Sequence, residues 1–296
     1  MNHTAKEEDM EHNERKPEWL RIKIQTNNKV REVEELLDTL NLNTVCREAR
    51  CPNRCECYSK KTATFMIMGS ICTRGCTFCN VRGGKPELLN REEPVNIAMA
   101  VERLGLKYVV VTSVTRDDLD DGGADHFGRV VEEIRRTTPD VRVEILISDL
   151  RGSKVAIERI AHAAPEVLNH NIETVPRLYS TVRPDADYRR SLEVIRSIKE
   201  MNPKIKTKSG IMLGLGETQE EVLEVFKDLR EHGCDLLTVG QYLRPSREHT
   251  PMERYISPEE FSWYRERALE MGFQGVASGP LVRSSYNAWE LYSSKD

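Results

Sequence analysis

The chain has 296 residues, 39% of them hydrophobic, which is enough to bury one barrel-sized core or two small ones. Its 48 acidic side chains outnumber the 44 basic ones, giving a net charge of −4 that argues against a densely basic nucleic-acid surface. No apolar run reaches the about 20 residues of a membrane span, and the acid-rich first sixteen residues contain no apolar stretch typical of a leader, so we expect a cytoplasmic protein with neither nucleic acid nor membrane as a partner.

The first expected element is a helix over residues 33–40, where four apolar side chains recur at helical spacing. From residue 63 onward, apolar strands alternate with helical periodicity. The strands are expected at residues 63–69, 108–113, 141–147, 166–174, 205–215, 234–243 and 273–278. The helices between and after them are expected around residues 127–134, 153–163, 192–198, 222–229 and 258–271.

This alternation predicts an α/β fold in which parallel strands are joined by right-handed crossover helices. A complete eight-stranded barrel takes about 250 residues, and the alternating part has room for about six units. We therefore expect an incomplete (βα)6 TIM-type barrel over residues 61–245. Residues 1–60 would form an N-terminal extension and residues 246–296 a C-terminal extension.

Eight cysteines in a reducing compartment indicate metal ligands rather than disulfides. Cys234 stands alone at the start of an apolar run, so we expect it in the core. Cys72, Cys76 and Cys79, within "ICTRGCTFCN", follow the strand 63–69 directly. Folds of this class carry their chemistry at the carboxyl ends of strands, so this loop is expected at the active end.

Three thiolates suit a cubane iron-sulfur cluster whose fourth iron is left to an exchangeable ligand. The alternative is a zinc site. It would use Cys76 and Cys79 as one C-x2-C pair, but no second such pair follows at finger or ribbon spacing. Iron and sulfur are therefore favoured, and colour separates the two hypotheses because a zinc protein is colourless.

The C-x3-C-x2-C loop resembles that of the radical S-adenosylmethionine (SAM) superfamily. The segment "CREARCPNRCECY" (46–58) and the C-terminal "RSSY" (283–286) make nearly the whole chain similar to the lipoyl synthases of that superfamily. The resemblance implies two 4Fe-4S clusters. Cys72, Cys76 and Cys79 would hold the one that binds SAM. The auxiliary cluster would be ligated by Cys46, Cys51, Cys57 and Ser285.

The resemblance also implies the reaction. A radical made from SAM would abstract hydrogen from an octanoyl group in amide linkage to a lysine of a lipoyl carrier domain. Sulfur from the auxiliary cluster would enter at carbons 6 and 8, with two SAM consumed. The implied partners are octanoylated lipoyl domains of E2 subunits and of the glycine cleavage H protein, a ferredoxin or flavodoxin as electron donor, and iron-sulfur assembly or carrier proteins.

A second enzyme hypothesis keeps the radical chemistry but transfers sulfur differently, as in methylthiolation of a tRNA base or a protein. Relatives of that kind usually carry a larger N-terminal domain and a nucleic-acid module, and this sequence has neither. A third hypothesis is a zinc-stapled binding protein without catalysis.

Cofactor contacts implied by the resemblance fall on Phe78, Thr112, Asn171 and Glu173. The spacing of Asn171 and Glu173 places both on one face near the end of a strand, although polar residues closing a strand would look the same. His170 alternates to the other side, where we expect a core hydrogen bond.

"RDDLDDGGADHF" (116–127) does not fit a calcium loop, since Leu119 falls at a ligand position; the resemblance puts this segment near the methionine end of SAM. "LGLGET" (213–218) is either a helix start, with Thr218 and Glu221 as a capping box, or a cofactor contact.

Cys55 departs from the family pattern, and we expect it not to be a ligand because the triad and serine already fill the site. Of the two serines in "RSSY", only one can reach the iron, since adjacent residues of an extended segment point to opposite sides. From the resemblance we choose Ser285 over Ser284, with Arg283 nearby to balance the anionic cluster.

Overall fold

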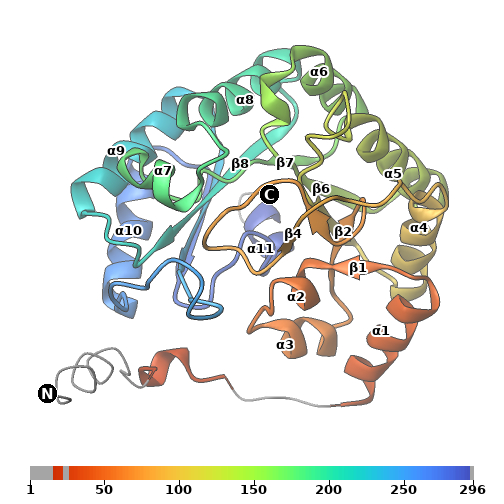
Figure 1. Cartoon of the computed structure of the whole chain (residues 1–296), viewed down its shortest axis with the longest axis horizontal. Coiled ribbons are helices and arrows are strands. Elements are labelled where there is room, and N and C mark those ends of the chain that lie inside the picture. The colour runs from red at the N-terminus through yellow and green to blue at the C-terminus, as the bar shows by residue number, and fades with distance from the viewer. Residues whose placement is uncertain (1–15, 23–26, 294–296) are drawn as a thin grey trace, which may run out of the picture.

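The computed structural model describes residues 16–22 and 27–293, and in it an outer ring of helices surrounds a curved sheet (Figure 1). The interpretation of the first sixteen residues concerns a segment that lies, except for Lys16, outside the described residues. Among the described helices, none is long and apolar enough to cross a membrane.

The sheet has eight strands in the order β1-β2-β5-β6-β7-β8-β9-β10. All pairs from β2 to β10 are parallel, and only β1 pairs antiparallel, with β2. The strands are β1 Asn43–Thr44, β2 Thr64–Ile67, β5 Tyr108–Ser113, β6 Arg142–Leu146, β7 Val167–Asn169, β8 Lys206–Leu213, β9 Leu236–Gln241 and β10 Gly275–Gly279. A separate pair joins β3 Ile71–Cys72 to β4 Arg82–Gly83. Because β1 and β10 end the order, the barrel is open, which confirms the expected incomplete α/β barrel.

Helices connect these strands. They are α1 Asn28–Thr39, α2 Val45–Glu48, α3 Arg54–Ser59, α4 Glu93–Leu104, α5 Ala124–Thr137, α6 Lys154–Ala163, α7 Tyr179–Val182, α8 Tyr188–Met201, α9 Gln219–Glu231, α10 Pro258–Glu270 and α11 Ala288–Ser293. Short 3-10 helices cover Glu18–Leu20, Leu150–Gly152 and Pro176–Leu178. The capping box predicted for α9 is present, with Thr218 accepting from Glu221 N and Glu221 accepting from Thr218 N.

Apolar helix faces predicted from periodicity are buried against the sheet. On α5 these are Phe127, Val130, Val131 and Ile134, and Cys234 is also buried as expected. Inside the barrel, the Lys208 ammonium lies 2.8 Å from the Glu144 carboxylate, which also accepts from Tyr108 Oη at 2.6 Å. Both charges are buried, so each depends on the other for solvation.

Two details differ from the expectations. The strand expected at 273–278 is present as β10, but it pairs parallel with β9, so the segment 246–296 contributes a seventh parallel strand to the barrel sheet instead of only an extension. Strand β7 ends at Asn169, so Asn171 and Glu173 lie beyond it rather than on it. Glu173 has φ 66°, a left-handed conformation, and only an isolated bridge joins it to Ile211; period-2 alternation does not reveal such a turn.

Candidate active site

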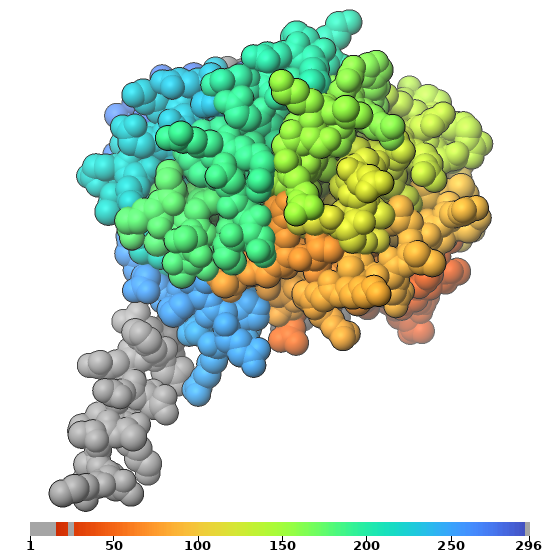
Figure 2. Space-filling view, turned by 45° about the horizontal axis from the view of Figure 1, so that its top comes forward, coloured from red at the N-terminus to blue at the C-terminus, as the bar shows by residue number. Residues whose placement is uncertain are grey.

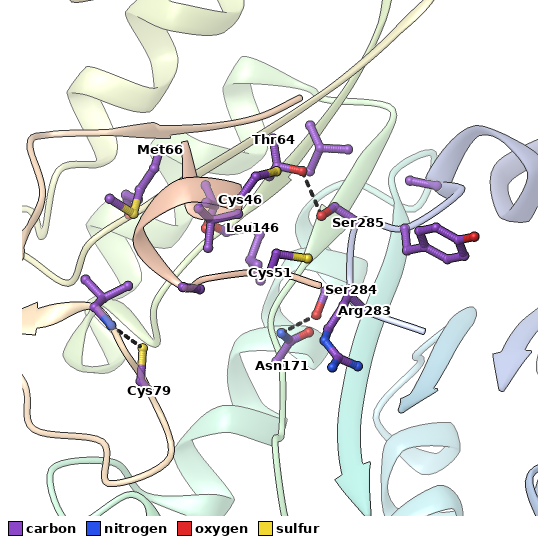
Figure 3. Close-up of a pocket in the computed structure, with 18 of the residues that line it drawn as sticks. Cys46, Cys51, Thr64, Met66, Cys79, Leu146, Asn171, Arg283, Ser284 and Ser285 are labelled. Carbon is purple, nitrogen blue, oxygen red and sulfur yellow. Dashed lines mark hydrogen bonds between the residues drawn. The ribbon is translucent and has the colours of Figure 1, made fainter. Parts of the chain in front are cut away.

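Both cysteine triads line one cavity of about 1030 Å³. Cys46, Cys51 and Cys57 come from the α2–α3 segment, and Cys72, Cys76 and Cys79 from the loop after β2. Figure 3 shows members of the two triads on the same pocket, with Met66 and Leu146 between them. The sequence predicted the two groups separately, and the fold brings them together.

The first triad is held in place by backbone contacts. Cys72 Sγ accepts hydrogen bonds from Thr115 N at 3.4 Å and Arg74 N at 3.5 Å, and Cys79 Sγ accepts from Val81 N at 3.4 Å. Donors aimed at sulfur stabilise negative charge there. For Cys79 this effect is outweighed, because burial raises the pKa of its thiol to about 12, so the thiol stays protonated until a metal binds.

Arg74, between the first two cysteines of this loop, fixes the loop to two neighbouring strand ends. Its guanidinium donates to Asp117 at 2.6 and 2.9 Å and to Asp149 at 2.6 Å, and Arg190 also donates to Asp149 at 2.7 Å. Burial alone would raise the pKa of Asp149, but the hydrogen bonds and charge of Arg74 hold it below its usual range. Sequence reasoning missed Arg74 as an anchor.

The loop also contacts the carboxyl-terminal half of the chain. Thr77 N donates to Val182 O at 3.1 Å, and Thr250 N donates to Thr77 O at 3.0 Å. His249 Nε2 lies 3.1 Å from Cys79 O. Figure 2 shows this loop region (orange) wedged between the α7 region (green) and the segment near residue 250 (blue).

Polar side chains gather at the end of the cavity that carries the three-cysteine loop. Asn171 Nδ2 donates to Glu173 Oε1 at 3.0 Å, while Glu173 Oε2 has no hydrogen-bond partner among the described residues. Burial raises the pKa of Glu173, and the nearby Arg183 charge opposes that rise. Arg183, another residue that the sequence patterns did not single out, is buried and also faces Cys76, whose pKa is raised mainly by burial.

The other two residues expected near the cofactor also line the cavity. Thr112, at the carboxyl end of β5, donates from Oγ1 to Leu146 O at 3.1 Å. Phe78 packs beside Val182 and Tyr242. Of the four residues, Phe78 belongs to the first triad's loop and the Glu173 carboxylate acts on the pKa of Cys76 and Cys79, while Asn171 joins Glu173 to Ser284.

The second triad lies on two short helices, α2 and α3. Cys46 is buried, and burial raises the pKa of its thiol to about 11. Burial, with the neighbouring thiols, raises the pKa of Cys57 to about 12. A thiol must lose its proton to bind a metal. These thiols therefore stay neutral until a metal takes the place of the proton. The pKa of Cys51 is raised by burial as well, while the Arg283 charge opposes the rise.

The C-terminal "RSSY" segment reaches this second triad. Asn53 Nδ2 donates to Leu281 O at 2.7 Å, and Tyr286 Oη donates to Glu56 at 3.1 Å. In Figure 3 the two serines point to different neighbours. Ser285 Oγ accepts from Thr64 Oγ1 at 2.7 Å beside Cys46, whereas Ser284 Oγ accepts from Asn171 Nδ2 at 2.6 Å.

Several candidates lie outside the cavity. None of residues 116–127, residues 213–218 and Cys55 lines it. His170 does line the cavity, but it forms the expected core hydrogen bond, between Nδ1 and Ile147 O at 3.0 Å, and burial lowers its pKa to about 4. The glycine-containing segment 213–218 leads into the capping box of α9, so its helix-start interpretation accounts for it.

The residues fit iron-sulfur clusters and SAM. Each triad offers three soft thiol donors with an arginine nearby, the buried Arg183 or the half-buried Arg283, to balance an anionic group. The free Glu173 oxygen and its Asn171 partner provide acceptor and donor groups for a polar ligand. Within the described part of the chain, no three His, Cys, Asp or Glu side chains converge on a single-ion site; the thiols are spread around a cavity.

Comparison with known families places the chain clearly. The profile of the radical SAM superfamily matches residues 66–229, and that of the N-terminal domain of lipoyl synthase matches residues 2–51. A lipoyl synthase of Alkaliphilus metalliredigens is 57% identical over 276 residues, covering 93% of this chain and 95% of the relative. One from Caldicellulosiruptor saccharolyticus is 58% identical, covering 93% and 97%.

Solved structures share the fold at low identity. Methylornithine synthase aligns with a TM-score of 0.54 at 15% identity, over 87% of each chain. The maturase HydG aligns with a TM-score of 0.57 at 16% identity, over 85% of this chain and 63% of its own. These likenesses support the barrel architecture alone.

Proposed function

Because the chain belongs to the lipoyl synthase family of the radical SAM superfamily, and is thus a sulfurtransferase that uses a 4Fe-4S cluster and SAM, we propose that it inserts two sulfur atoms into an octanoyl group. The group is held in amide linkage on a lysine of a lipoyl carrier domain. Sulfur enters at carbons 6 and 8, and each insertion consumes one SAM.

The single observation that carries this proposal is the meeting of two thiol triads in one cavity whose intervening wall is apolar. Met66, Val110 and Leu146 line that wall. An octanoyl chain offers only aliphatic C–H bonds, beyond the reach of acid-base side chains, so a radical is needed. A sulfur donor held beside the same cavity replaces an encounter with dissolved sulfide.

Cys72, Cys76 and Cys79 are proposed to hold the cluster that binds SAM. When bound, this cluster supplies the electron that splits SAM into methionine and the radical that abstracts hydrogen from the substrate. The chain's own task here is orientation. Glu173 and Asn171 are positioned to hydrogen-bond the polar groups of SAM, Phe78 and Thr112 shape the surrounding wall, and the apolar wall excludes water from the radical.

A second 4Fe-4S cluster is proposed on Cys46, Cys51 and Cys57, with Ser285 Oγ on the fourth iron, as the sulfur source. The hydrogen bond from Thr64 orients Ser285 beside Cys46. A hard alkoxide on soft-ligated iron is the ligand most easily released by protonation, which suits a cluster that must be opened. Arg283 lies near Cys51 to balance its charge.

The proposed partners follow from this reaction. They are octanoylated lipoyl domains of E2 subunits and of the glycine cleavage H protein, a ferredoxin or flavodoxin that delivers electrons, and iron-sulfur carrier proteins that rebuild the auxiliary cluster. All would be met in the cytoplasm.

An anaerobic reaction tests the proposal. The protein, loaded with iron and sulfide, is mixed with octanoylated lipoyl domain, dithionite and SAM, and the domain is then weighed by mass spectrometry. We expect the mass gain of two sulfur atoms, because each reacting C–H bond becomes a C–S–H group under these reducing conditions. An unchanged octanoyl group, or a methylthio adduct instead, would contradict it.

A further inference from the structure

The cavity extends past both triads toward the opposite end of the barrel. Its lining includes Thr112 and Ser113 at the carboxyl end of β5 and also Lys107 and Tyr108 at its amino end. Six residues of strand span about 17 Å at roughly 3.3 Å per residue. The cavity therefore follows the full length of this strand.

Helix α11 covers most of the amino end. Its Trp289 and Tyr292 rings lie 5.9 and 5.7 Å from the Tyr108 ring, and Leu291 packs on Val167 and Leu236, the first residues of β7 and β9. Lys206 Nζ, at the start of β8, donates to Tyr292 O at 3.3 Å. In Figure 1, α11 lies within the ring of strands.

An opening remains between α11 and the α3–β2 connection. Six residues there line the cavity and are exposed to solvent: Lys60, Thr62, Gly105, Lys107, Trp289 and Glu290. Inward of this rim the wall is apolar, with Ala63, Leu106, Val110 and Ala288. The cavity thus has a second mouth, at the end of the barrel away from the first triad.

The two ends differ in chemistry. The carboxyl end carries the Cys72 loop, Asn171 and Glu173, the polar groups assigned above to SAM. The amino end offers an apolar passage that ends near Thr64 and the second triad. A ligand with a long aliphatic chain fits the amino end, because burying such a chain there removes apolar surface from water without stranding polar groups.

We propose that the mouth beside α11 admits the acylated lysine, and that the carrier domain docks on the surface formed by α11, α3 and the α4–β5 turn. This inference rests on the proposed function. From its Cα to the last acyl carbon, an octanoyl-lysine side chain extends about 16 Å. Entering here, it brings its distal carbons to the level of both triads while the carrier domain stays outside.

The rim indicates the charge of the docked surface. Lys107 forms no ion pair with any described residue, and Lys60 is paired at 2.8 Å with Glu56. Glu290 is one acid at the same rim. An acidic patch beside the acylated lysine of the carrier complements Lys107, and Trp289, 45% exposed, offers an apolar contact.

Photocrosslinking can show at which mouth the octanoylated carrier domain docks, and the experiment requires no catalytic turnover. A benzoylphenylalanine is introduced at Lys107, at the amino-end rim, or at Glu248, an exposed lining residue at the carboxyl end. Each cluster-loaded protein is irradiated with octanoylated or unmodified carrier domain. We expect crosslinking from position 107 that depends on the octanoyl group. The proposal would be overturned if position 107 gave no crosslink, or if the crosslinking yield from position 248 equalled or exceeded the yield from position 107.

A charge reversal gives a second readout. Lys107→Glu should raise the KM for the octanoylated domain roughly tenfold while leaving kcat, and the KM for a short octanoyl-lysine peptide, unchanged. The matched control is Lys227→Glu. Lys227 is an exposed lysine of α9 that is distant in sequence from the rim residues. Equal KM values for the two variants would count against docking at this mouth. A wild-type protein that inserts no sulfur would instead refute the proposed function, while the crosslinks still report the docking face.

Discussion

Ser284 and Ser285 are neighbours in the chain with different surroundings. Ser285 Oγ accepts a hydrogen bond from Thr64, whose side chain also contacts Cys46. Ser284 Oγ instead accepts from Asn171, at the end assigned to SAM. Each serine is therefore oriented by a different element, and substitutions at the two positions should separate cleanly.

We expect Ser285→Ala to cleave SAM but make no lipoyl product, because the auxiliary cluster loses its fourth ligand. Ser284→Ala should retain clear activity, since it removes one hydrogen bond to Asn171. Chromatography of 5'-deoxyadenosine and the mass of the carrier domain report the two steps separately. The reverse pattern would move the ligand to Ser284, and two fully active variants would rule out ligation by either serine.

Arg74 is the charged anchor of the three-cysteine loop. It is buried and bridges Asp117 and Asp149. Removing one partner of a buried charge network leaves the others unsolvated, at a cost of about 3–5 kcal/mol. An exposed pair such as Arg136 with Glu133 contributes less than about 1 kcal/mol.

Arg74→Ala should therefore lower the free energy of unfolding of the metal-free protein by about 3 kcal/mol or more, measured by urea denaturation under reducing conditions. Arg136→Ala is the matched control and should change it by less than about 1 kcal/mol. Equal effects would mean that the Arg74 network contributes no more to the free energy of unfolding than a surface ion pair does.

At the scale of elements, the two cysteine segments have different anchors, although one hydrogen bond, from Asn80 Nδ2 to Glu48 O at 2.7 Å, joins them. The loop with Cys76 is tied to α7 and to residue 250, whereas the α2–α3 segment with Cys51 is tied to the C-terminal "RSSY" segment. We expect a cysteine substitution in one of these segments to leave the other segment folded. The two proposed clusters can then be removed one at a time.

Cys76→Ala should abolish 5'-deoxyadenosine formation, because the proposed electron source is lost. Cys51→Ala should still cleave SAM, retain about half of the iron, and yield no thiolated carrier. Iron analysis and product chromatography measure both. Normal deoxyadenosine from Cys76→Ala would refute the assignment of its triad.

Cys55 provides the control within α3. It does not line the cavity that the other three cysteines of its segment share. Cys55→Ala should therefore keep the full iron content and the full yield of product. Loss of half the iron in this variant would make Cys55 a ligand in place of Cys46, Cys51 or Cys57.

At the scale of the molecule, local periodicity in the sequence predicted most strands and helices of the barrel, although helix α4 was missed. Strand β5 was predicted to the residue, the capping box of α9 is present, and the parallel order follows from alternating strands and helices. These features succeed because each is encoded within a few adjacent residues. The two proposed cysteine triads, predicted from spacing and from the family resemblance, line one cavity.

Features that depend on distant residues were missed. Arg74 forms a hydrogen bond with Asp149, which is 75 residues away in the sequence, and Ser285 forms one with Thr64, which is 221 residues away. The turn at Glu173 follows from tertiary contacts, because its N–H donates to Gly210 O across to β8. The extension of the cavity to α11 needed the three-dimensional fold. Spacing along the chain contains no information on any of these.

The central claim is that sulfur held by the second triad enters the substrate. The direct measurement is a single-turnover reaction of protein whose clusters were built with heavy-isotope sulfide, run without added sulfide and followed by mass spectrometry of the carrier domain. We expect both inserted sulfur atoms to be heavy in the wild type, and none to be inserted by Cys51→Ala. Light sulfur in the wild-type product, or heavy product from Cys51→Ala, would contradict the account.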